Sequence, residues 1–299
     1  MALPDRHHAL RVAGPEVVLY HADCLDGFGA AWALWKRFPS ASYRPVKHGY
    51  PPPAGLSGQR ILIVDFSYPR EQLERIAREA TALLVLDHHI TAQQALEGLP
   101  YVCFEEKKSG AVMAWEWAHQ TPVPWLLRYI QDKDLWLWEL PASREINAAL
   151  ASYPYDFDVW ERFRQDTLRV EGQAILRYEQ EVVGKIAESA VLVEFQGETV
   201  PAVQSSVLTT QIGERLSRDY AFCIIWHDRD GRRFYSLRSH ADGADVGKIA
   251  AAHGGGGHTH AAGFSVPLGE HSVSPLAPLR DSAGAPGREK DKQGRKDRA

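Results

Sequence analysis

The sequence predicts an α/β protein: a first domain on a parallel sheet, a helical linker, and a smaller second α/β domain with a mixed sheet. Three observations predict this arrangement. Short apolar runs alternate with helical patterns in the first half of the chain, which is typical of βαβ units. A long helical pattern covers 167–190, and further strand and helix patterns follow it. We expect domains over 1–155 and 191–268, a linker over 156–190 and a tail over 269–299.

The strands of the first domain are predicted from apolar runs rich in β-branched residues. These runs cover 16–21, 60–65 and 82–87. The helices expected between and after them cover the ranges 28–38, 69–80, 109–119 and 124–136. Pro69 would open the second of these helices, and Ser109 would cap the third.

The second domain is predicted from a shorter series of the same signals. Strands are expected over 191–195, 221–226 and 234–238, and helices over 211–218 and 245–253. Gly172 and Gly184 are weak points in the long helix that precedes them. The ordered chain is expected to end near Leu268.

Composition excludes several classes of protein. The chain has 299 residues, of which 44% are hydrophobic and 24% are charged, so it is neither wholly disordered nor collagen-like. No apolar run is long enough to cross a membrane, and the first residues lack an apolar signal core, which predicts a cytoplasmic location. The three cysteines, Cys24, Cys103 and Cys223, form neither a disulfide framework nor a CxxC site.

The charge is unevenly distributed along the chain. The net charge is −4, which argues against a protein that coats long nucleic acids but leaves room for a small phosphorylated substrate. The segment 271–299 carries seven Lys or Arg against four acids, without an aromatic residue. Such a segment cannot bury enough apolar surface to offset its ordering entropy, so we expect the tail to be disordered.

Three of the predicted strands end in polar residues: His21, Asp65 and Asp87. In an open parallel sheet, ligands bind beyond the carboxyl ends of the strands. These side chains are therefore expected to converge although they are far apart in the sequence. Imidazole and carboxylate groups gathered in this way suit a metal ion.

Other polar groups surround these strand ends. Asp23 and Asp26 follow His21, and His88 and His89 follow Asp87, where one imidazole could bind metal and the other face a substrate. A polar turn with a helix cap is the plainer interpretation of the first group. Asp132-Lys133-Asp134, taken alone, indicates a solvated charge run.

The second domain contains the run Gly254-Gly255-Gly256-Gly257-His258. Four glycines are costly in backbone entropy, and backbone N–H groups that approach an anion would account for them. A flexible linker is the alternative. Arg238 and Ser239, at the end of a predicted strand, could also contact a phosphate.

Several common motifs of nucleotide-binding proteins and hydrolases are absent from the sequence. The sequence has no Walker A loop and no GxGxxG after a strand, which argues against an ATPase or a nicotinamide dehydrogenase. It has no GxSxG nucleophile elbow either.

Taken together, the motifs resemble the DHH phosphoesterase family with its C-terminal DHH-associated domain. The segments that carry the resemblance are CLDGFGAAW, VDFS, LDHH, DKDLW, SLRS and GGGGHTHAAGF, in the family order. The resemblance covers about 16–268. It is closest to the nanoRNase and bisphosphonucleotide phosphatase branch, which is related to the RecJ-type exonucleases.

The resemblance implies two divalent ions, most often Mn²⁺, with Mg²⁺ or Co²⁺ as alternatives. The implied metal ligands are His21, Asp23, Asp26, Asp65, His88 and Asp132, with Asp65 between the ions. Asp87 would orient its neighbours, and the catalytic group would comprise Asp65, Asp87, His88 and His89. His89, Arg238, Ser239, Gly256, Gly257 and His258 would contact the substrate.

The first and fourth motifs leave alternatives open. The commoner family pattern has Asp-x-Asp before Gly, whereas this chain has Cys24-Leu25-Asp26, so either Asp23 or Cys24 would complete the first metal shell. Asp134 competes with Asp132 for its role.

The expected function is hydrolysis of phosphodiester or phosphomonoester bonds of short nucleotides by a hydroxide activated between two metal ions. Candidate substrates are short oligoribonucleotides, linear or cyclic dinucleotides and a 3′,5′-bisphosphonucleoside. The alternatives are an inorganic pyrophosphatase, a single-strand exonuclease and a non-catalytic nucleotide-binding module. No membrane partner is expected, and a homodimer is possible. Most tryptophans are expected in the core, with Trp136 or Phe28 as candidates for stacking on a base.

Overall fold

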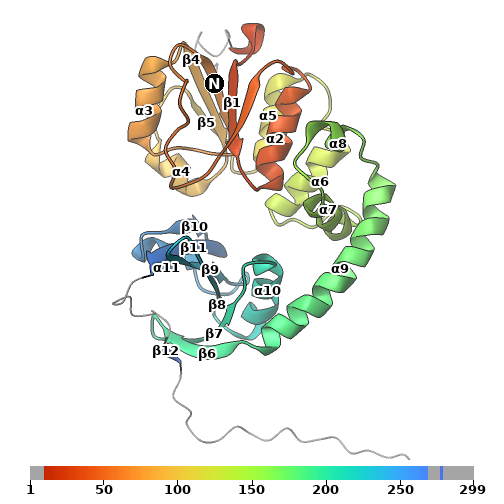
Figure 1. Cartoon of the computed structure of the whole chain (residues 1–299), viewed down its shortest axis with the longest axis vertical. Coiled ribbons are helices and arrows are strands. Elements are labelled where there is room, and N and C mark those ends of the chain that lie inside the picture. Colours follow the sequence, from red (N-terminus) through yellow and green to blue (C-terminus); the bar gives the residue numbers. More distant parts are fainter. Residues whose placement is uncertain (1–9, 269–276, 279–299) are drawn as a thin grey trace, which may run out of the picture.

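The computed structural model describes residues 10–268 and 277–278. Figure 1 shows two α/β units, one above the other, joined along one side by the long helix α9 (Gln165–Glu188). The first unit is built on a five-stranded sheet and the second on a seven-stranded one. Within the described ranges, no helix combines the length and the apolar character needed to cross a bilayer.

The sheet of the first unit is parallel throughout and has the strand order β2-β1-β3-β4-β5. Its strands are β1 (Val17–His21), β2 (Ser42–Val46), β3 (Arg60–Val64), β4 (Ala82–Asp87) and β5 (Val102–Phe104). The strand order reverses between β1 and β3, which is where open sheets of this kind bind ligands.

Helices cover both faces of this sheet. The side chains of Val18, Leu62 and Leu84 are buried on the face covered by α2 (Leu25–Trp35) and α5 (Gly110–Ala118). The alternate residues, such as Leu19 and Ile63, are buried on the other face against α3 (Arg70–Glu79) and α4 (Ile90–Ala95). Because successive residues of a strand point to opposite faces, a strand buried on both sides is apolar at every position.

Three further helices extend the α2/α5 face: α6 (Trp125–Asp134), α7 (Ser143–Ser152) and α8 (Phe157–Glu161). Aromatic rings hold α8 in place: Phe157 stacks on Phe28 at 4.9 Å and on Trp35 at 5.1 Å. Phe28 is only 2% exposed, so it cannot stack on a substrate base, whereas Trp136 is 50% exposed.

Helix α9 begins against the first unit and ends beside the second. A Cβ atom added at Gly172 would lie 1.8 Å from the carbonyl oxygen of Glu145, so only glycine allows α9 to pack this closely on α7. Gly172, which the sequence indicated as a weak point of the helix, therefore allows the helix to pack against the first unit.

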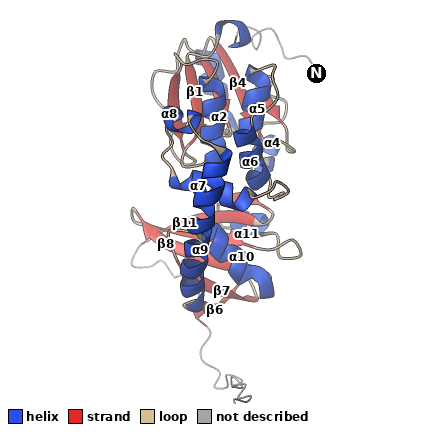
Figure 2. Cartoon of the chain, turned by 90° about the vertical axis from the view of Figure 1, so that its right-hand side faces the viewer, coloured by secondary structure: helices blue, strands red, loops and turns tan. Residues whose placement is uncertain are grey.

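The sheet of the second unit is mixed and has the order β10-β11-β9-β8-β7-β6-β12, in which only the β7–β8 pair is parallel among the described strands. Its strands are β6 (Val191–Phe195), β7 (Glu198–Gln204), β8 (Cys223–Arg229), β9 (Arg232–Arg238), β10 (Gly256–His258), β11 (Ala261–Pro267) and β12 (Ala277–Pro278). Helices α10 (Thr209–Leu216) and α11 (Val246–Ala252) and the 3₁₀ turn η1 (Ser217–Asp219) complete the unit. Figure 2 shows its strands below the first unit, with α9 and α10 on the near side.

The predicted fold class is confirmed: a parallel α/β unit, a helical connection and a smaller mixed-sheet unit. The strands predicted from the sequence did not include β2, β5, β7, β10, β11 or β12. Strand β2 is an edge strand that contains Pro45, β5 has three residues, and β7 contains Pro201, so each lacks the uninterrupted apolar run that marks a strand. The proposed domain limits stay predictions, and of the predicted tail only 277–278 lie within the described residues.

Candidate metal centre

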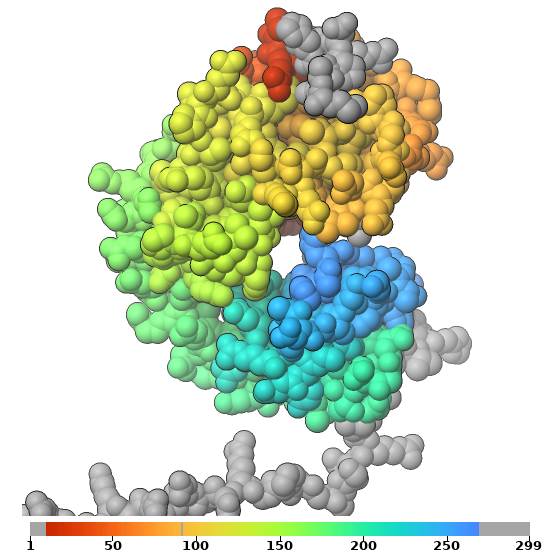
Figure 3. All heavy atoms as spheres, turned by 180° about the vertical axis from the view of Figure 1, so that it is seen from behind, coloured from red at the N-terminus to blue at the C-terminus, as the bar shows by residue number. Residues whose placement is uncertain are grey.

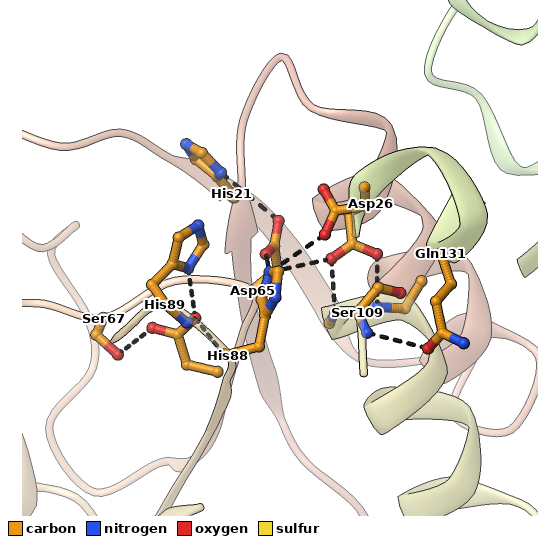
Figure 4. A network of polar contacts seen from close by, with 12 residues as sticks. His21, Asp26, Asp65, Ser67, His88, His89, Ser109 and Gln131 are labelled. Atoms are coloured by element: carbon orange, nitrogen blue, oxygen red, sulfur yellow. Dashed lines mark hydrogen bonds and ion pairs between the residues drawn. The ribbon is translucent and has the colours of Figure 1, made fainter. Parts of the chain in front are cut away.

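The carboxyl ends of β1, β3 and β4 bring His21, Asp65 and Asp87 to one edge of the sheet, as the sequence predicts. Figure 4 shows His21 and His88 on either side of Asp65, with Asp26 beyond. Asp26, Asp65, Asp87 and His88 are all buried. Because three of these four residues lie at a strand end or directly after one, the sheet itself sets their spacing.

Asp65 lies at the middle of the group. It directly follows β3 and has a left-handed backbone with φ 53°, a conformation that a residue other than glycine rarely adopts. One carboxylate oxygen lies 3.2 Å from His88 Nε2, and the other lies 3.6 Å from His21 Nδ1. Burial alone would raise the pKa of Asp65, but the adjacent imidazoles of His21 and His88 hold it below the ordinary value.

The imidazole of His88 is surrounded by carboxylates. Its Nε2 atom lies 3.2 Å from Asp65, 3.5 Å from Asp134 and 3.7 Å from Asp26. Burial opposes its protonation, yet the hydrogen bond with Asp65 and these negative charges raise the pKa of His88 to about 10. The group therefore attracts positive charge to this position, and a metal cation would replace the proton there.

Asp26 stabilises the fold and also belongs to the group of side chains around His88. Its two oxygens accept hydrogen bonds from the backbone N–H of Gly110 at 2.6 Å and of Ala111 at 2.9 Å, at the start of α5. A Cβ atom at residue 110 would lie 2.5 Å from Asp65 Cβ, so glycine is needed for this approach. Burial and the negative charges of Asp134 and Asp65 raise the pKa of Asp26 well above the ordinary value.

Among the described residues, three overlapping sets of side chains could hold a metal ion, each with its ligand atoms within 4.8 Å of one another. Two of them share no residue: one consists of His21, Cys24 and Asp65, and the other of Asp26, His88 and Asp134. The third, Asp65, Asp87, His88 and His89, overlaps both. His21 Nδ1 and the Asp65 oxygen that faces it are buried without a hydrogen-bond partner. Since buried polar atoms are nearly always satisfied, these two orphaned atoms fit a cation between them.

The structure corrects the assignment of Asp132. Its carboxylate accepts hydrogen bonds from the backbone N–H of Glu139 at 2.9 Å and of Leu140 at 3.3 Å, so it fixes the turn after α6. Asp134, the competing candidate, is the residue whose carboxylate reaches His88. Burial and the nearby Asp65 charge raise the pKa of Asp134 to about 6, although His88 opposes the shift.

The structure also corrects the assignment of Asp23. This side chain is 73% exposed and forms an ion pair with Lys47, whereas Cys24 lies with His21 and Asp65. Burial and the neighbouring carboxylates raise the pKa of the Cys24 thiol well above the ordinary value. Of the two alternatives left open by the sequence, Cys24 is therefore the one that the fold places in the group.

Asp87 orients the residues around it, as expected. It accepts hydrogen bonds from Ser67 Oγ at 2.5 Å and from the backbone N–H of His88 at 2.8 Å, and it lies 2.6 Å from His89 Nδ1. These contacts leave the Nε2 edge of the His89 ring free. Burial opposes protonation of His89, but the hydrogen bond to Asp87 raises its pKa.

The glycine run of the second unit forms an ordered hairpin rather than a linker. Strands β10 and β11 pair through Gly256–Gly263, Gly257–Ala262 and His258–Ala261. A Cβ atom at Gly257 would lie 2.5 Å from the carbonyl oxygen of Ala261, which explains this glycine by packing, whereas nothing lies near a Cβ atom at Gly256. Packing therefore does not explain the glycine at 256, which is part-buried.

His258 connects the two units. Its ring stacks on that of His89, with centroids 5.4 Å apart, and β10 lies beside α4. Burial and the positive charge of His89 lower the pKa of His258. In Figure 3, the blue second unit meets the first unit next to an open hollow.

Arg238 and Ser239 are bound within the second unit. Arg238 donates to the carbonyl oxygens of Leu237 at 2.9 Å and Ala262 at 3.5 Å. The Ser239 hydroxyl donates to the carbonyl of Ala244 at 2.7 Å and lies 3.0 Å from His260 Nδ1. No described contact joins either side chain to the metal-binding residues, so a role in phosphate contact stays a prediction.

Sequence reasoning missed His48. Its ring stacks on Phe66 at 4.4 Å and meets the edge of His21 at 5.4 Å. It follows β2, which neighbours β1 in the sheet. Its position just after a strand could have identified it, but Pro45 interrupts the sequence pattern of β2, so that strand was not predicted.

Comparison with known proteins gives a similar fold at low sequence identity. No protein-family model matches the chain. An uncharacterized protein of Acanthamoeba polyphaga mimivirus, R106, is 29% identical over 287 residues, covering 84% of this chain and 67% of that protein. Among solved structures, the DHH domain of a member of a family of ribosomal proteins has a TM-score of 0.52 at 13% identity, covering 86% of this chain and 84% of that one.

Two further structures match less well over most of their length. Exonuclease RecJ bound to manganese has a TM-score of 0.48 at 18% identity, covering 89% of this chain and 91% of that one. The pGpG-specific phosphodiesterase PggH of Vibrio cholerae also has a TM-score of 0.48, at 14% identity, covering 84% of this chain and 93% of that one. The match to the DHH domain, with its TM-score of 0.52, confirms the fold implied by the sequence motifs: this chain has the fold of the DHH-domain proteins.

Proposed function

We propose that this protein is a metal-dependent phosphoesterase that hydrolyses phosphodiester or phosphomonoester bonds of short nucleotides. The observation that carries the proposal is the pair of adjacent ligand sets, His21–Cys24–Asp65 and Asp26–His88–Asp134, at the reversal point of the parallel sheet. The resemblance of the sequence motifs to DHH phosphoesterases supports the same reaction class.

Asp65 is the residue that would contact both cations, because its two oxygens face opposite ligand sets. One oxygen faces His21 and the other faces His88. Divalent cations bound here would supply charge to offset a phosphate and would lower the pKa of a water molecule. The carboxylate and imidazole ligands, five of the six side chains in these two sets, suit Mn²⁺, our first choice, with Mg²⁺ or Co²⁺ as alternatives, whereas Cys24 is a softer ligand.

His89 is suited to contact the phosphate. Asp87 fixes its Nδ1 atom at 2.6 Å, so the ring presents Nε2 away from the sheet. His258 stacks on the same ring from the second unit. In this arrangement, His89 can donate a hydrogen bond to a phosphate oxygen, and the backbone N–H group of Gly256 can contribute from the second unit.

The proposal is tested by a product assay with Mn²⁺. The panel comprises ribonucleotide 2- to 5-mers, a long single strand, linear and cyclic dinucleotides, a 3′,5′-bisphosphonucleoside and pyrophosphate. We expect turnover of one or more short nucleotides. The Asp65→Asn variant should lose about a thousandfold in kcat, since metal-supplied charge stabilisation amounts to several kcal/mol.

Asp228→Asn is the matched control, because Asp228 is a carboxylate at the surface of the second unit, paired with Arg233. Its kcat should be unchanged. Hydrolysis of pyrophosphate alone would contradict the proposal in favour of a pyrophosphatase, and rapid digestion of the long strand would favour an exonuclease. The absence of turnover on every substrate, or full activity of Asp65→Asn, would also contradict it.

A further inference from the structure

The turn that follows α6 exposes a large aromatic side chain beside the metal centre. Trp136 is 50% exposed and Leu137 is 48% exposed. Trp136 and Trp138 both have a left-handed backbone, with φ 59° and 56°. Bulky residues seldom adopt this conformation, and strained residues that persist in a fold cluster at ligand sites.

Asp132 holds this turn in its conformation. Its carbonyl oxygen accepts hydrogen bonds from the N–H of Leu137 at 2.9 Å and of Trp138 at 3.2 Å. Its carboxylate binds the next two N–H groups, as described above, and is buried. The Asp132 carboxyl group and carbonyl therefore bind four successive N–H groups, which makes the turn rigid before any ligand arrives.

The ring of Trp136 is supported from one side. Its centroid lies 5.2 Å from that of Trp138 in an edge-to-face contact, and the Arg144 guanidinium lies 4.3 Å from the Trp138 ring centroid. A ring that is held by one edge-to-face contact and half exposed loses little conformational freedom when a flat ligand stacks on it.

The turn lies between the metal centre and the second unit. Asp134, two residues before Trp136, reaches His88 at 3.5 Å. Arg144, which supports Trp138, also pairs with Glu214 of α10 through two contacts of 3.3 Å. In Figure 3, the yellow-green part of the chain borders the hollow between the units. A ligand whose phosphate lies at the metal centre thus has this turn within its reach.

We propose that Trp136 is a stacking platform for a nucleobase of the substrate whose phosphate binds at the metal centre. This inference rests on the proposed function and narrows it, because it requires a base-bearing substrate and disfavours pyrophosphate. A stacking contact accepts any base, since every base has a π face, so the turn would contribute affinity without strict sequence preference.

The kinetic test compares a ribonucleotide trimer with an abasic trimer that has the same sugar–phosphate backbone. Trp136→Ala should raise the KM for the normal trimer roughly tenfold, as expected for the loss of one stacked base, and should leave the abasic KM unchanged. Trp136→Phe should restore most of the affinity. Tyr178→Ala is the matched control, because Tyr178 is an aromatic residue on α9 with 72% exposure.

A binding test needs no activity. A non-hydrolysable dinucleotide analogue added to the Mg²⁺-loaded protein should quench part of its tryptophan fluorescence, and this part should be absent in Trp136→Phe. Equal quenching in both proteins, or equal KM increases on both trimers, would overturn the platform. If the wild type cleaves no phosphoester, the proposed function fails, while the quenching difference still decides whether Trp136 binds a base.

Discussion

The strand ends of the first unit and the β10–β11 hairpin of the second contain two kinds of candidate site residue. In the first unit, Asp26, Asp65 and His88 are buried and contact one another. In the second, His258 is exposed and Ser239 is bound by its own unit. Charged groups are thus concentrated and buried in the first unit, while the hairpin of the second unit presents an exposed imidazole ring.

Because of this difference, we expect the first unit to bind the cations and the hairpin to contact the substrate. A buried group of three carboxylates around one imidazole has few ways to relax, so its members depend strongly on one another. The hairpin contacts the first unit through the imidazole of His258, which stacks on His89. Changes in the first unit should therefore affect metal affinity, and changes in the hairpin should affect substrate affinity.

The largest effect is expected from the pair Asp134 and Asp132. Asp134→Asn should weaken Mn²⁺ binding by about 100-fold or more, because a ligand is lost from one of the two sets. Asp132→Asn should instead lower the free energy of unfolding by about 1–3 kcal/mol, because charge-assisted hydrogen bonds to the turn are weakened. Calorimetric titration with Mn²⁺ and chemical denaturation of each variant measure the two quantities.

The two variants serve as controls for each other. If Asp132→Asn lost as much Mn²⁺ affinity as Asp134→Asn, the assignment of separate roles to the two residues would be wrong. Asp134→Asn should not lower the stability of the metal-free protein, since burial and the charge of Asp65 disfavour the ionised Asp134 carboxylate more than His88 favours it.

The next effect is the pH dependence of stability without metal. The pKa of His88 is raised from 6.5 to about 10, so its stabilisation is complete below about pH 6.5 and is lost as the pH rises toward 10. The pKa of Asp134 is raised from 3.8 to about 6, so its ionisation destabilises the fold as the pH rises through this range. Asp65 acts in the opposite sense, but its contribution is lost only in stronger acid, below the ordinary carboxyl pKa.

In EDTA, the Tm should therefore be higher at pH 6 than at pH 9. Saturating Mn²⁺ should reduce or reverse this difference, because ligation requires deprotonated groups. Thermal denaturation at both pH values, with and without Mn²⁺, checks the sign. A Tm that rises from pH 6 to pH 9 in EDTA would show that the carboxylates around His88 do not dominate.

The smallest effect is expected in the hairpin. His258→Ala should raise the KM for a short nucleotide severalfold and leave Mn²⁺ affinity and Tm nearly unchanged, because the side chain is exposed. His89→Ala, on the first-unit side of the same stack, should reduce kcat as well. Steady-state kinetics of both variants measure this contrast, and a fall in metal affinity for His258→Ala would contradict it.

The sequence predicted those parts of the fold that depend on local pattern. The runs at β1, β3 and β4 are apolar at nearly every position, which indicated a buried parallel sheet, and the polar residues at their ends located the site. The sequence could not separate Asp132 from Asp134, because both stand at the end of one helix. Which of them faces the site depends on the turn that follows, where two tryptophans adopt left-handed backbones that no local preference predicts.

The same limit applies to Cys24 and His48. Cys24 enters the group because Asp23 takes a left-handed conformation with φ 55° and points to Lys47. His48 is brought to His21 by pairing between β1 and β2, which is a contact between segments far apart in the sequence. The glycines at 172 and 257 were recognised as costly, but only packing shows what each allows.

The two hydrogen bonds from α5 to Asp26 have a consequence for the evolution of this protein. Asp26 caps a buried helix and faces the metal centre, so selection for folding alone would preserve it in a descendant that had lost its reaction. His21 caps no helix in this way, and its Nδ1 atom has no hydrogen-bond partner among the described residues. In a set of related chains, replacement of His21 with retention of Asp26 would therefore mark the lineages that have lost the proposed metal centre but kept the fold.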